Sequence, residues 1–212
     1  MPNIKLVIFD LDGTLIDAYK AINSSFNYVM SKLGLRLRSA KRIRKAVGWG
    51  DLQLLKPFVS KADLPRAALL YRRHHARSLL KHSRLYPQVR SLLEELKTRG
   101  LKLAVASNRP SKFSLILLKH LKLRKFFDLV LCADQLKHGK PSPEILNKIV
   151  KRLGLKKSQT LYVGDMVIDA QAGSRAKINT VIVMGGSSSR AQIVKEKPFK
   201  IIVKIGGLKD LL

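Results

Sequence analysis

The sequence predicts an α/β protein with a parallel sheet, into which a helical segment is inserted. Short and almost wholly apolar runs recur at residues 4–9, 101–107, 126–133, 160–165 and 179–184. Segments with the apolar spacing of helices lie between these runs. Strands that alternate with helices of this length form a parallel sheet with right-handed crossovers. Residues 17–83, in contrast, contain no convincing strand.

Each element of the predicted sheet has its own signal. The first run, IKLVIF, shows little polar alternation, which is typical of a strand covered on both faces. The segment 89–100 carries Leu92, Leu93 and Leu96 at helical spacing, and Gly100 is placed to end that helix. Residues 111–121 and 142–155 show the same helical pattern.

The inserted segment is predicted to be helical throughout. Helix-like patterns cover residues of about 18–34, 39–48, 50–59 and 64–82, with glycines and prolines between them. We therefore divide the chain into a core domain of residues 1–16 and 84–212 and a helical domain of residues 17–83.

Composition favours a soluble protein that folds without disulfides. The chain has 212 residues, enough for one domain with a sizeable insertion. Cys132 is the only cysteine, so no internal disulfide is possible, and we expect it to be buried. We see no signal peptide and no run long enough to span a membrane. We expect a cytoplasmic location.

The charge is strongly positive, with 42 lysines and arginines against 14 acids and a formal net charge of +28. Such a surface attracts polyanions. Either it has been selected to bind nucleic acid or another polyanion, or it reflects a compositional bias of the whole proteome. Residues 17–83 hold 15 of the basic residues and 3 of the acids. We favour the bias because the basic residues form no single tract.

Polar residues with complementary chemistry follow three of the predicted strands. Ligands of open α/β sheets bind at the carboxyl ends of the strands. The residues found there, or in the loop before a helix, are Asp10, Asp12, Ser107, Asn108, Lys140, Asp165 and Asp169. Carboxylates brought so close repel one another unless a cation lies among them. A hard dication, Mg²⁺ above all, resolves this conflict and takes a substrate phosphate as a further ligand.

Four motifs make the chain similar to a known superfamily. The motifs DLDGTL, SN, GKPSPE and GDMVID occur in this order, and the match spans nearly the whole chain. They resemble the motifs of the haloacid dehalogenase superfamily of Mg²⁺-dependent phosphotransferases, and SNRP and ADQLKHGKPSPE resemble its phosphoglycolate phosphatase-like branch. The resemblance implies a Rossmann-like three-layer core and a mobile helical cap that closes over the site.

The carboxylates have separate expected roles. Asp10 is the expected nucleophile, because a carboxylate that attacks phosphorus splits one hard displacement into two easier ones. Asp12 points to the same side in extended geometry and is expected to act as acid and then as base. We expect Asp10, Asp12 and Asp165 to hold the metal. Asp169 is expected to orient Lys140 or a metal-bound water.

The other site residues are expected to bind the phosphoryl group. Ser107 and Asn108 can donate hydrogen bonds to its oxygens, and Lys140 can offset its growing charge. Gly13 allows the chain to turn away from the strand, and Thr14 is better explained as a turn or cap residue than as a catalyst.

The cap is expected to set substrate specificity. Arg42, Arg44, Lys45 and Trp49 are the candidates for entering the site when the cap closes. A basic cap suits a substrate that carries a carboxylate, such as 2-phosphoglycolate, but it also suits nucleotides and sugar phosphates. The five histidines show no metal-binding spacing, and we expect them to be solvated.

Two positions depart from the pattern of the resembling family. Lys177 stands where a helix-ending glycine is usual, so that helix must end at Asn179 or at a residue forced into the left-handed region. Gln88 stands where a glycine is usual after Pro87. Neither change affects a residue with an expected catalytic role.

The expected function is Mg²⁺-dependent hydrolysis of a small phosphorylated metabolite through an aspartyl-phosphate. Asp12 argues against a dehalogenase, since dehalogenases of the superfamily lack an acid there. A phosphomutase stays an alternative, although mutases typically show Asp-Gly-Val and a cap histidine soon afterwards. A nucleic-acid-binding protein or a polynucleotide-end phosphatase is the other alternative. The sequence leaves open whether the protein is a monomer or a homodimer.

Overall fold

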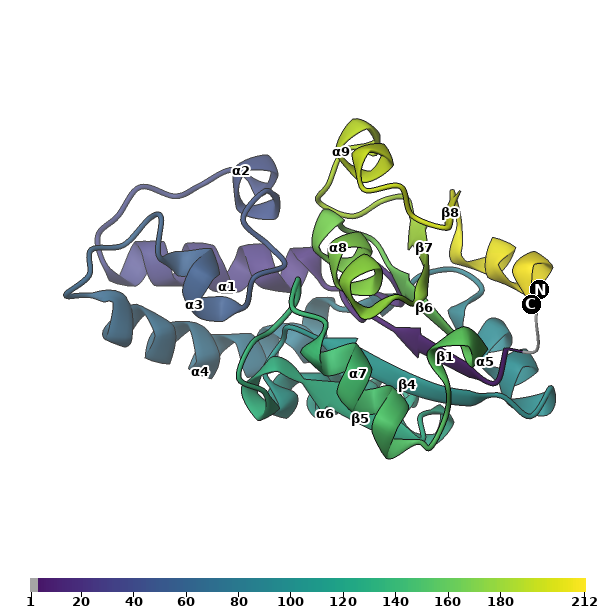
Figure 1. The fold of residues 1–212 in the computed structure, drawn as a ribbon. Coiled ribbons are helices and arrows are strands. Elements are labelled where there is room, and N and C mark those ends of the chain that lie inside the picture. The colour runs from purple at the N-terminus through teal and green to yellow at the C-terminus, as the bar shows by residue number, and fades with distance from the viewer. Residues whose placement is uncertain (1–3) are drawn as a thin grey trace.

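The computed structural model describes residues 4–212 and has a six-stranded parallel sheet (Figure 1). The strand order is β5-β4-β1-β6-β7-β8. The strands are β1 (Leu6–Phe9), β4 (Lys102–Ser107), β5 (Leu129–Cys132), β6 (Thr160–Gly164), β7 (Asn179–Val183) and β8 (Lys200–Ile202). Strand β1 pairs with both β4 and β6. The residues that follow β1 therefore lie at the middle of the sheet's carboxyl edge.

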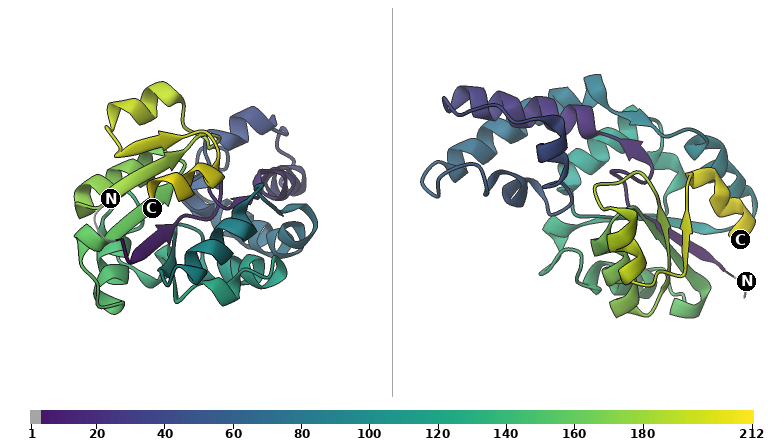
Figure 2. Two further views of the ribbon diagram at one scale, coloured as in Figure 1. Left: turned by 90° about the vertical axis from the view of Figure 1, so that its right-hand side faces the viewer. Right: turned by 90° about the horizontal axis from the view of Figure 1, so that it is seen from above.

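Helices cover both faces of the sheet, as the alternation of strands and helices predicts. Val7 and Phe9 pack on one side against α5 (Val89–Thr98) and α6 (Ser111–His120). Leu6 and Ile8 pack on the other side against α7 (Glu144–Arg152) and α8 (Val167–Ala176). The left view of Figure 2 shows these layers. Every residue of β1 is buried, which confirms a strand covered on both faces.

The inserted segment is helical, as predicted, and lies beyond the carboxyl edge of the sheet (Figure 1). Its helices are α1 (Tyr19–Lys32), α2 (Ala40–Arg44), α3 (Asp51–Leu55) and α4 (Leu64–His82). They share an apolar cluster of their own that includes Phe26, Met30, Leu55 and Tyr71. We call residues 17–83 the cap.

The cap joins the core through a short antiparallel pair, β2 (Ile16–Asp17) with β3 (Arg84–Leu85). The proposed domain boundaries, after residues 16 and 83, fall at this pair. Strands β2, β3 and β8 have no counterpart among the predicted elements, because two or three residues are too few to show a periodicity. The remaining elements are α9 (Arg190–Lys195) and the 3₁₀ helices η1 (Arg124–Phe126), η2 (Ala133–Gln135), η3 (Lys157–Gln159) and η4 (Ile205–Leu211).

Within residues 4–212, no helix combines the length and the apolar character that crossing a bilayer requires. Cys132 is buried at the end of β5, as expected, and burial raises the pKa of its thiol to about 11.

Lys177 and Gln88 both adopt the left-handed region, with φ of 58° and 67°. Helix α8 ends at Ala176, and Lys177 follows it in the left-handed conformation, which is the second of the two expected ways to end this helix. A side chain in this region costs roughly 1 kcal/mol relative to glycine. The sequence departures from the family pattern are thus sites of local backbone strain.

Replacing Lys177 with glycine is expected to stabilise the protein by about 0.5–1 kcal/mol, because glycine has no Cβ to strain at φ of 58°. Lys177 is exposed, so little packing is lost. Chemical denaturation measures the change. Gly154→Lys is the matched control, because Gly154 has φ of 66° and open space around it, and there the same exchange in reverse should destabilise the fold. Equal stability of wild type and Lys177→Gly would contradict the assignment of strain.

Candidate active site

The carboxyl ends of β1 and β6 place two aspartates side by side. Asp10 follows β1 directly, and its backbone N–H donates to the carbonyl oxygen of Val163 in β6 at 2.9 Å. Asp165 follows β6, and Asp169 comes from the first turn of α8. The carboxylate oxygens of Asp10, Asp165 and Asp169 lie within 4.8 Å of one another. The structure thus brings three of the four expected carboxylates together.

A buried lysine lies among these carboxylates. Lys140, which is 3% exposed, places its Nζ 2.8 Å from Asp10 Oδ1 and 2.7 Å from Asp169 Oδ1. It also donates to the hydroxyl of Tyr162 at 3.1 Å, and that hydroxyl donates to Asp169 at 2.6 Å. Lys140 is therefore a buried residue of the site and not a solvated loop lysine.

The oxygens of Asp169 are all occupied by donors from the protein. Oδ1 accepts from Lys140 and Tyr162, and Oδ2 accepts from the backbone N–H groups of residues 165 and 166 at 3.2 and 3.0 Å. This arrangement suits the role expected for Asp169, which is to orient Lys140.

Asp165, in contrast, has a buried oxygen without a partner. Its Oδ1 accepts from Thr14 Oγ1 at 3.2 Å, whereas its Oδ2 is buried and has no hydrogen bond. A Cβ added to Gly13 or Gly186 would lie 2.1 or 2.0 Å from that Oδ2. Glycine is thus required at both positions to let the backbone approach this carboxylate. Thr14, a residue expected to lie in a turn, orients Asp165.

The crowding of carboxylates raises their affinity for protons. Burial, together with the charges of Asp169 and Asp12, raises the pKa of Asp10 to about 7 although Lys140 opposes the shift. Burial and the neighbouring carboxylates also raise the pKa of Asp165 well above its usual value. Burial alone would lower the pKa of Lys140, but Asp10 and Asp169 outweigh it and raise that pKa.

The residues present fit a hard divalent cation. A buried carboxylate oxygen without a donor, beside a second carboxylate whose proton affinity is raised, is an oxygen-rich site with an unbalanced negative charge. Magnesium takes such a site through one or two carboxylates, and waters and substrate oxygens fill its remaining positions. Asp10 and Asp165 would hold the ion.

The contribution of Asp10 to the stability of the metal-free protein is expected to fall as pH rises from about 4 to about 7. Across this range the folded protein retains a proton on Asp10 that the unfolded chain has released, so rising pH favours unfolding. Mg²⁺ needs the ionised carboxylates and should therefore raise the melting temperature more at about pH 8 than at about pH 5.5. Thermal melts with and without Mg²⁺ measure this difference. An equal shift at both pH values would contradict a carboxylate site for the ion.

The side chain of Asp12 does not join this group. Its two carboxylate oxygens accept from Arg109, from Nη2 at 2.6 Å and from Nε at 2.8 Å. Arg109 is 8% exposed, and its Nη1 lies 2.7 Å from Nε2 of His75, a residue of cap helix α4. Asp12 is therefore paired with Arg109, which in turn contacts the cap through His75, and its side chain lies outside the cluster of Asp10, Asp165 and Asp169. Its expected role as a metal ligand stays a prediction.

Ser107 and Asn108 lie beside Asp10 at the end of β4, as expected. The hydroxyl of Ser107 accepts from the backbone N–H of Arg109 at 3.2 Å. The side-chain amide of Asn108 donates to the carbonyl oxygens of Gly48 and Lys140, both at 2.9 Å. Asn108 thereby holds the cap against the loop that carries Lys140.

A cavity between cap and core opens onto these groups. Its core side is lined by Asp10, Asp12, Ser107, Asn108, Arg109 and Lys140. Its cap side is mainly apolar and includes Ile22, Val47, Leu54 and Tyr71.

The basic cap residues expected at the site do not line this cavity. Arg44 lies over the ring of Tyr19, 4.0 Å from its centroid, and donates to the carbonyl oxygens of Gly185 and Gly186. Trp49 is half exposed and lines a neighbouring groove that also includes His138, Asn108 and Lys140. In this structure Arg44 joins the cap to the core, and neither residue reaches the space beside Asp10.

Arg109 and His75 are the site residues that sequence reasoning missed. Arg109 is part of the SNRP motif, but its position gives no sign of a contact with Asp12, 97 residues earlier. His75 was expected to be solvated, and that was wrong, because it is 2% exposed. Burial and the neighbouring Arg109 lower the pKa of His75 to about 2, so it is neutral. A motif-based search does not find a histidine whose role depends on the docking of the cap.

Comparison with known proteins places this geometry in a family. The profile of haloacid dehalogenase-like hydrolases matches residues 7–183. The chain is 33% identical over 183 residues to a phosphoglycolate phosphatase of Aquifex aeolicus, covering 86% of each chain. It is 31% identical over 209 residues to one of Pseudomonas syringae, covering 93% of this chain and 76% of the relative.

A solved structure shows the same fold over the whole chain. The crystal structure of a protein described as a predicted phosphoglycolate phosphatase from Haemophilus somnus superposes with a TM-score of 0.94 at 26% identity, covering 100% of this chain and 99% of the other. The family match confirms the resemblance seen in the four motifs. This chain therefore belongs to the haloacid dehalogenase-like hydrolase family, and within it the chain is an enzyme of the phosphatase type.

Proposed function

We propose that this protein hydrolyses a small phosphate monoester of the 2-phosphoglycolate type, with Mg²⁺, through a phosphorylated Asp10. The observation that carries the proposal is the convergence of Asp10, Asp165 and Lys140 at the carboxyl ends of β1 and β6, where Asp165 Oδ2 has no partner. The names of relatives at about a third identity support the class of substrate.

In the first step a carboxylate oxygen of Asp10 attacks phosphorus. The new bond joins Asp10 to phosphorus, the bond from phosphorus to the leaving oxygen breaks, and that oxygen keeps the electron pair and takes a proton from Asp12. Lys140, 2.8 Å from Asp10, offsets the charge on the phosphoryl oxygens. Bound Mg²⁺ would supply further charge neutralisation for those oxygens.

In the second step water releases the phosphate. Asp12, now ionised, removes a proton from the attacking water as the water oxygen bonds to phosphorus. The bond between Asp10 and phosphorus breaks, and Asp10 leaves with the electron pair as a carboxylate. Tyr162 and Asp169 hold Lys140 in place during both steps through buried hydrogen bonds. The cap covers the cavity with apolar side chains, which keeps bulk water away from the intermediate.

A panel of phosphate esters with Mg²⁺ tests the proposal. We expect phosphate release from p-nitrophenyl phosphate and from 2-phosphoglycolate, and loss of both activities in EDTA. An isomerised sugar phosphate in place of free phosphate would instead identify a mutase. The absence of turnover with every ester in the panel would contradict the proposal.

A groove outside the cavity favours nucleic-acid binding as a second candidate function. It lies between α4 and α6 and is lined by Arg72, Arg73, Arg77 and Lys112 together with an aromatic pair. The rings of Tyr28 and His74 stack there, with centroids 4.3 Å apart and an angle of 19°. Stacked rings beside basic side chains are the parts of a single-strand binding surface. The sequence could not show this pair, because its members come from different helices.

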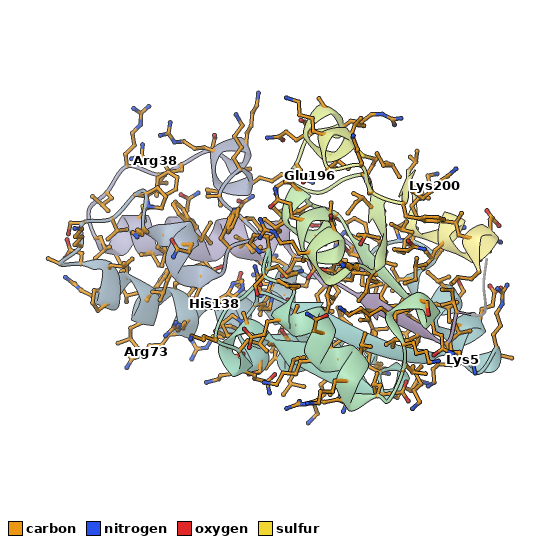
Figure 3. All side chains as sticks on the ribbon, viewed as in Figure 1. Lys5, Arg38, Arg73, His138, Glu196 and Lys200 are labelled. Carbon is orange, nitrogen blue, oxygen red and sulfur yellow. The ribbon has the colours of Figure 1, made fainter. Side chains whose placement is uncertain are left out.

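The distribution of charge favours a general attraction of polyanions to the whole basic surface over specific binding in the groove. Figure 3 shows Arg38 and Arg73 on the cap and Lys5 and Lys200 on distant parts of the core, so basic side chains occur on both the cap and the core and are not confined to the groove. Titration of a single-stranded oligonucleotide at several salt concentrations separates the two. Binding through the groove should weaken in Arg77→Gln and Tyr28→Ala and keep a steep salt dependence in the wild type. Weak binding that these changes leave unaltered would identify a general charge effect.

A further inference from the structure

The charged side chains that line the cavity differ in their ion-pair partners. Lys140 is held by Asp10 and Asp169, and Asp51 is paired with Arg72 at 2.6 Å. Among the described residues that line the cavity, Arg109 is the one other cation. Its partner Asp12 is the residue that must move a proton in the proposed mechanism.

The ion pair between Asp12 and Arg109 conflicts with the proposed role of Asp12 as a proton donor. Both of its carboxylate oxygens accept hydrogen bonds from Arg109, so neither can turn to a leaving oxygen while the pair is intact. A bidentate guanidinium also stabilises an ionised carboxylate, which is the opposite of what a proton donor needs. Turnover therefore requires another group to take the place of Asp12 on Arg109.

The surroundings of Arg109 indicate which group can replace Asp12 as its partner. Arg109 contacts His75 of the cap, so it lies on the cap side of Asp12, where the leaving alcohol of the substrate must extend. Of the other cap residues in the lining, Ile22, Val47, Leu54 and Tyr71 carry no charge, and Asp51 is neutralised by its pair with Arg72. Carboxylates and phosphates both match the guanidinium fork that Asp12 now fills. Because the phosphoryl group is expected beside Asp10 and Lys140, a carboxylate on the alcohol is the group left for Arg109.

His75 keeps Arg109 available for this exchange. It is buried and neutral, so its Nε2 accepts from Arg109 without cancelling the positive charge. Its Nδ1–H donates to Ser25 Oγ at 3.0 Å, and that hydroxyl donates to the carbonyl oxygen of Ala21 at 2.9 Å. Arg109 is thus fixed from the cap by a chain of satisfied hydrogen bonds.

We infer that Arg109 is the binding site for a carboxylate on the leaving alcohol, and that this carboxylate displaces Asp12. The inference rests on the proposed function and deepens it, because it selects phosphate esters of short hydroxy acids. Once displaced, Asp12 takes up a proton from the solvent, turns to the leaving oxygen and gives it that proton as the bond from phosphorus to that oxygen breaks and Asp10 becomes phosphorylated. Substrate recognition and proton donation are coupled through one guanidinium.

Two esters that differ in the carboxylate test the recognition. The wild type should turn over 2-phosphoglycolate with a far higher kcat/KM than ethyl phosphate. In Arg109→Met this preference should fall at least about 30-fold, and in Arg109→Lys less, because a lysine keeps the charge but loses the fork. Arg66→Met, an exposed change on the same cap helix as His75, is the matched control and should keep the preference.

A second measurement uses the wild type alone and does not depend on how the variants fold. Acetate should occupy Arg109 and raise the turnover of ethyl phosphate several-fold above that in chloride at equal ionic strength. Failure of acetate to activate would overturn the exchange of partners, and an unchanged preference in Arg109→Met would overturn the recognition. Absence of turnover of p-nitrophenyl phosphate by the wild type would count against the proposed function instead.

Discussion

Replacing Asp10 with asparagine is expected to lower the turnover of p-nitrophenyl phosphate at least about a thousandfold, because an amide oxygen cannot form the aspartyl-phosphate. The change keeps the shape of the side chain. It removes a negative charge from a site where Asp165 and Asp169 already crowd one another, so the fold should be kept. Phosphate release in the presence of Mg²⁺ measures the loss.

Asp210→Asn makes the same chemical change at an exposed position and should leave turnover unaltered. Circular dichroism of Asp10→Asn shows whether the variant is folded. A folded Asp10→Asn protein that retains more than about a tenth of the wild-type rate would contradict covalent catalysis by this residue.

Replacing Lys140 with methionine is expected to lower the free energy of unfolding by about 3–5 kcal/mol near pH 8 and to reduce turnover at least about a hundredfold. Lys140 is 3% exposed and lies within 2.8 Å of both Asp10 and Asp169. Its loss leaves buried carboxylates without compensation. Acidification should reduce the destabilisation because Asp10 and Asp165 can take up protons, and Mg²⁺ should reverse part of it at higher pH.

Lys137→Met provides the control in the same loop, since Lys137 is exposed and should tolerate the change. Urea denaturation at two pH values, with and without Mg²⁺, gives the four comparisons. A Lys140→Met protein as stable as Lys137→Met in the absence of metal would show that the carboxylates do not depend on this lysine.

The carboxyl edge of the sheet could be predicted from the sequence because it follows from local rules. Apolar runs mark buried strands, and parallel strands direct their ends to one edge. Asp10 and Asp165 therefore converge even though 154 residues separate them along the chain. Lys140 could be identified only through the GKPSPE motif, because a lone lysine in a loop of so basic a chain would otherwise be read as solvated.

The cap side of the site could not be predicted in this way. Which residues of a helix face the core depends on how the whole cap docks, and no periodicity encodes that angle. The basic residues expected at the substrate, Arg44 among them, contact the core elsewhere, whereas His75 turned out to be buried against Arg109. The number of basic residues in the cap thus said little about which of them reach the cavity.

The most direct test of the account is to look for the phosphorylated aspartate. Asp12→Asn, which lacks the base for the second step, should accumulate a covalent phosphoryl group when it is mixed with p-nitrophenyl phosphate and Mg²⁺ and quenched in acid. Peptide mass spectrometry should find that group on Asp10. A quenched protein that has turned over substrate but carries the phosphoryl group on another residue, or on none, would contradict the central claim.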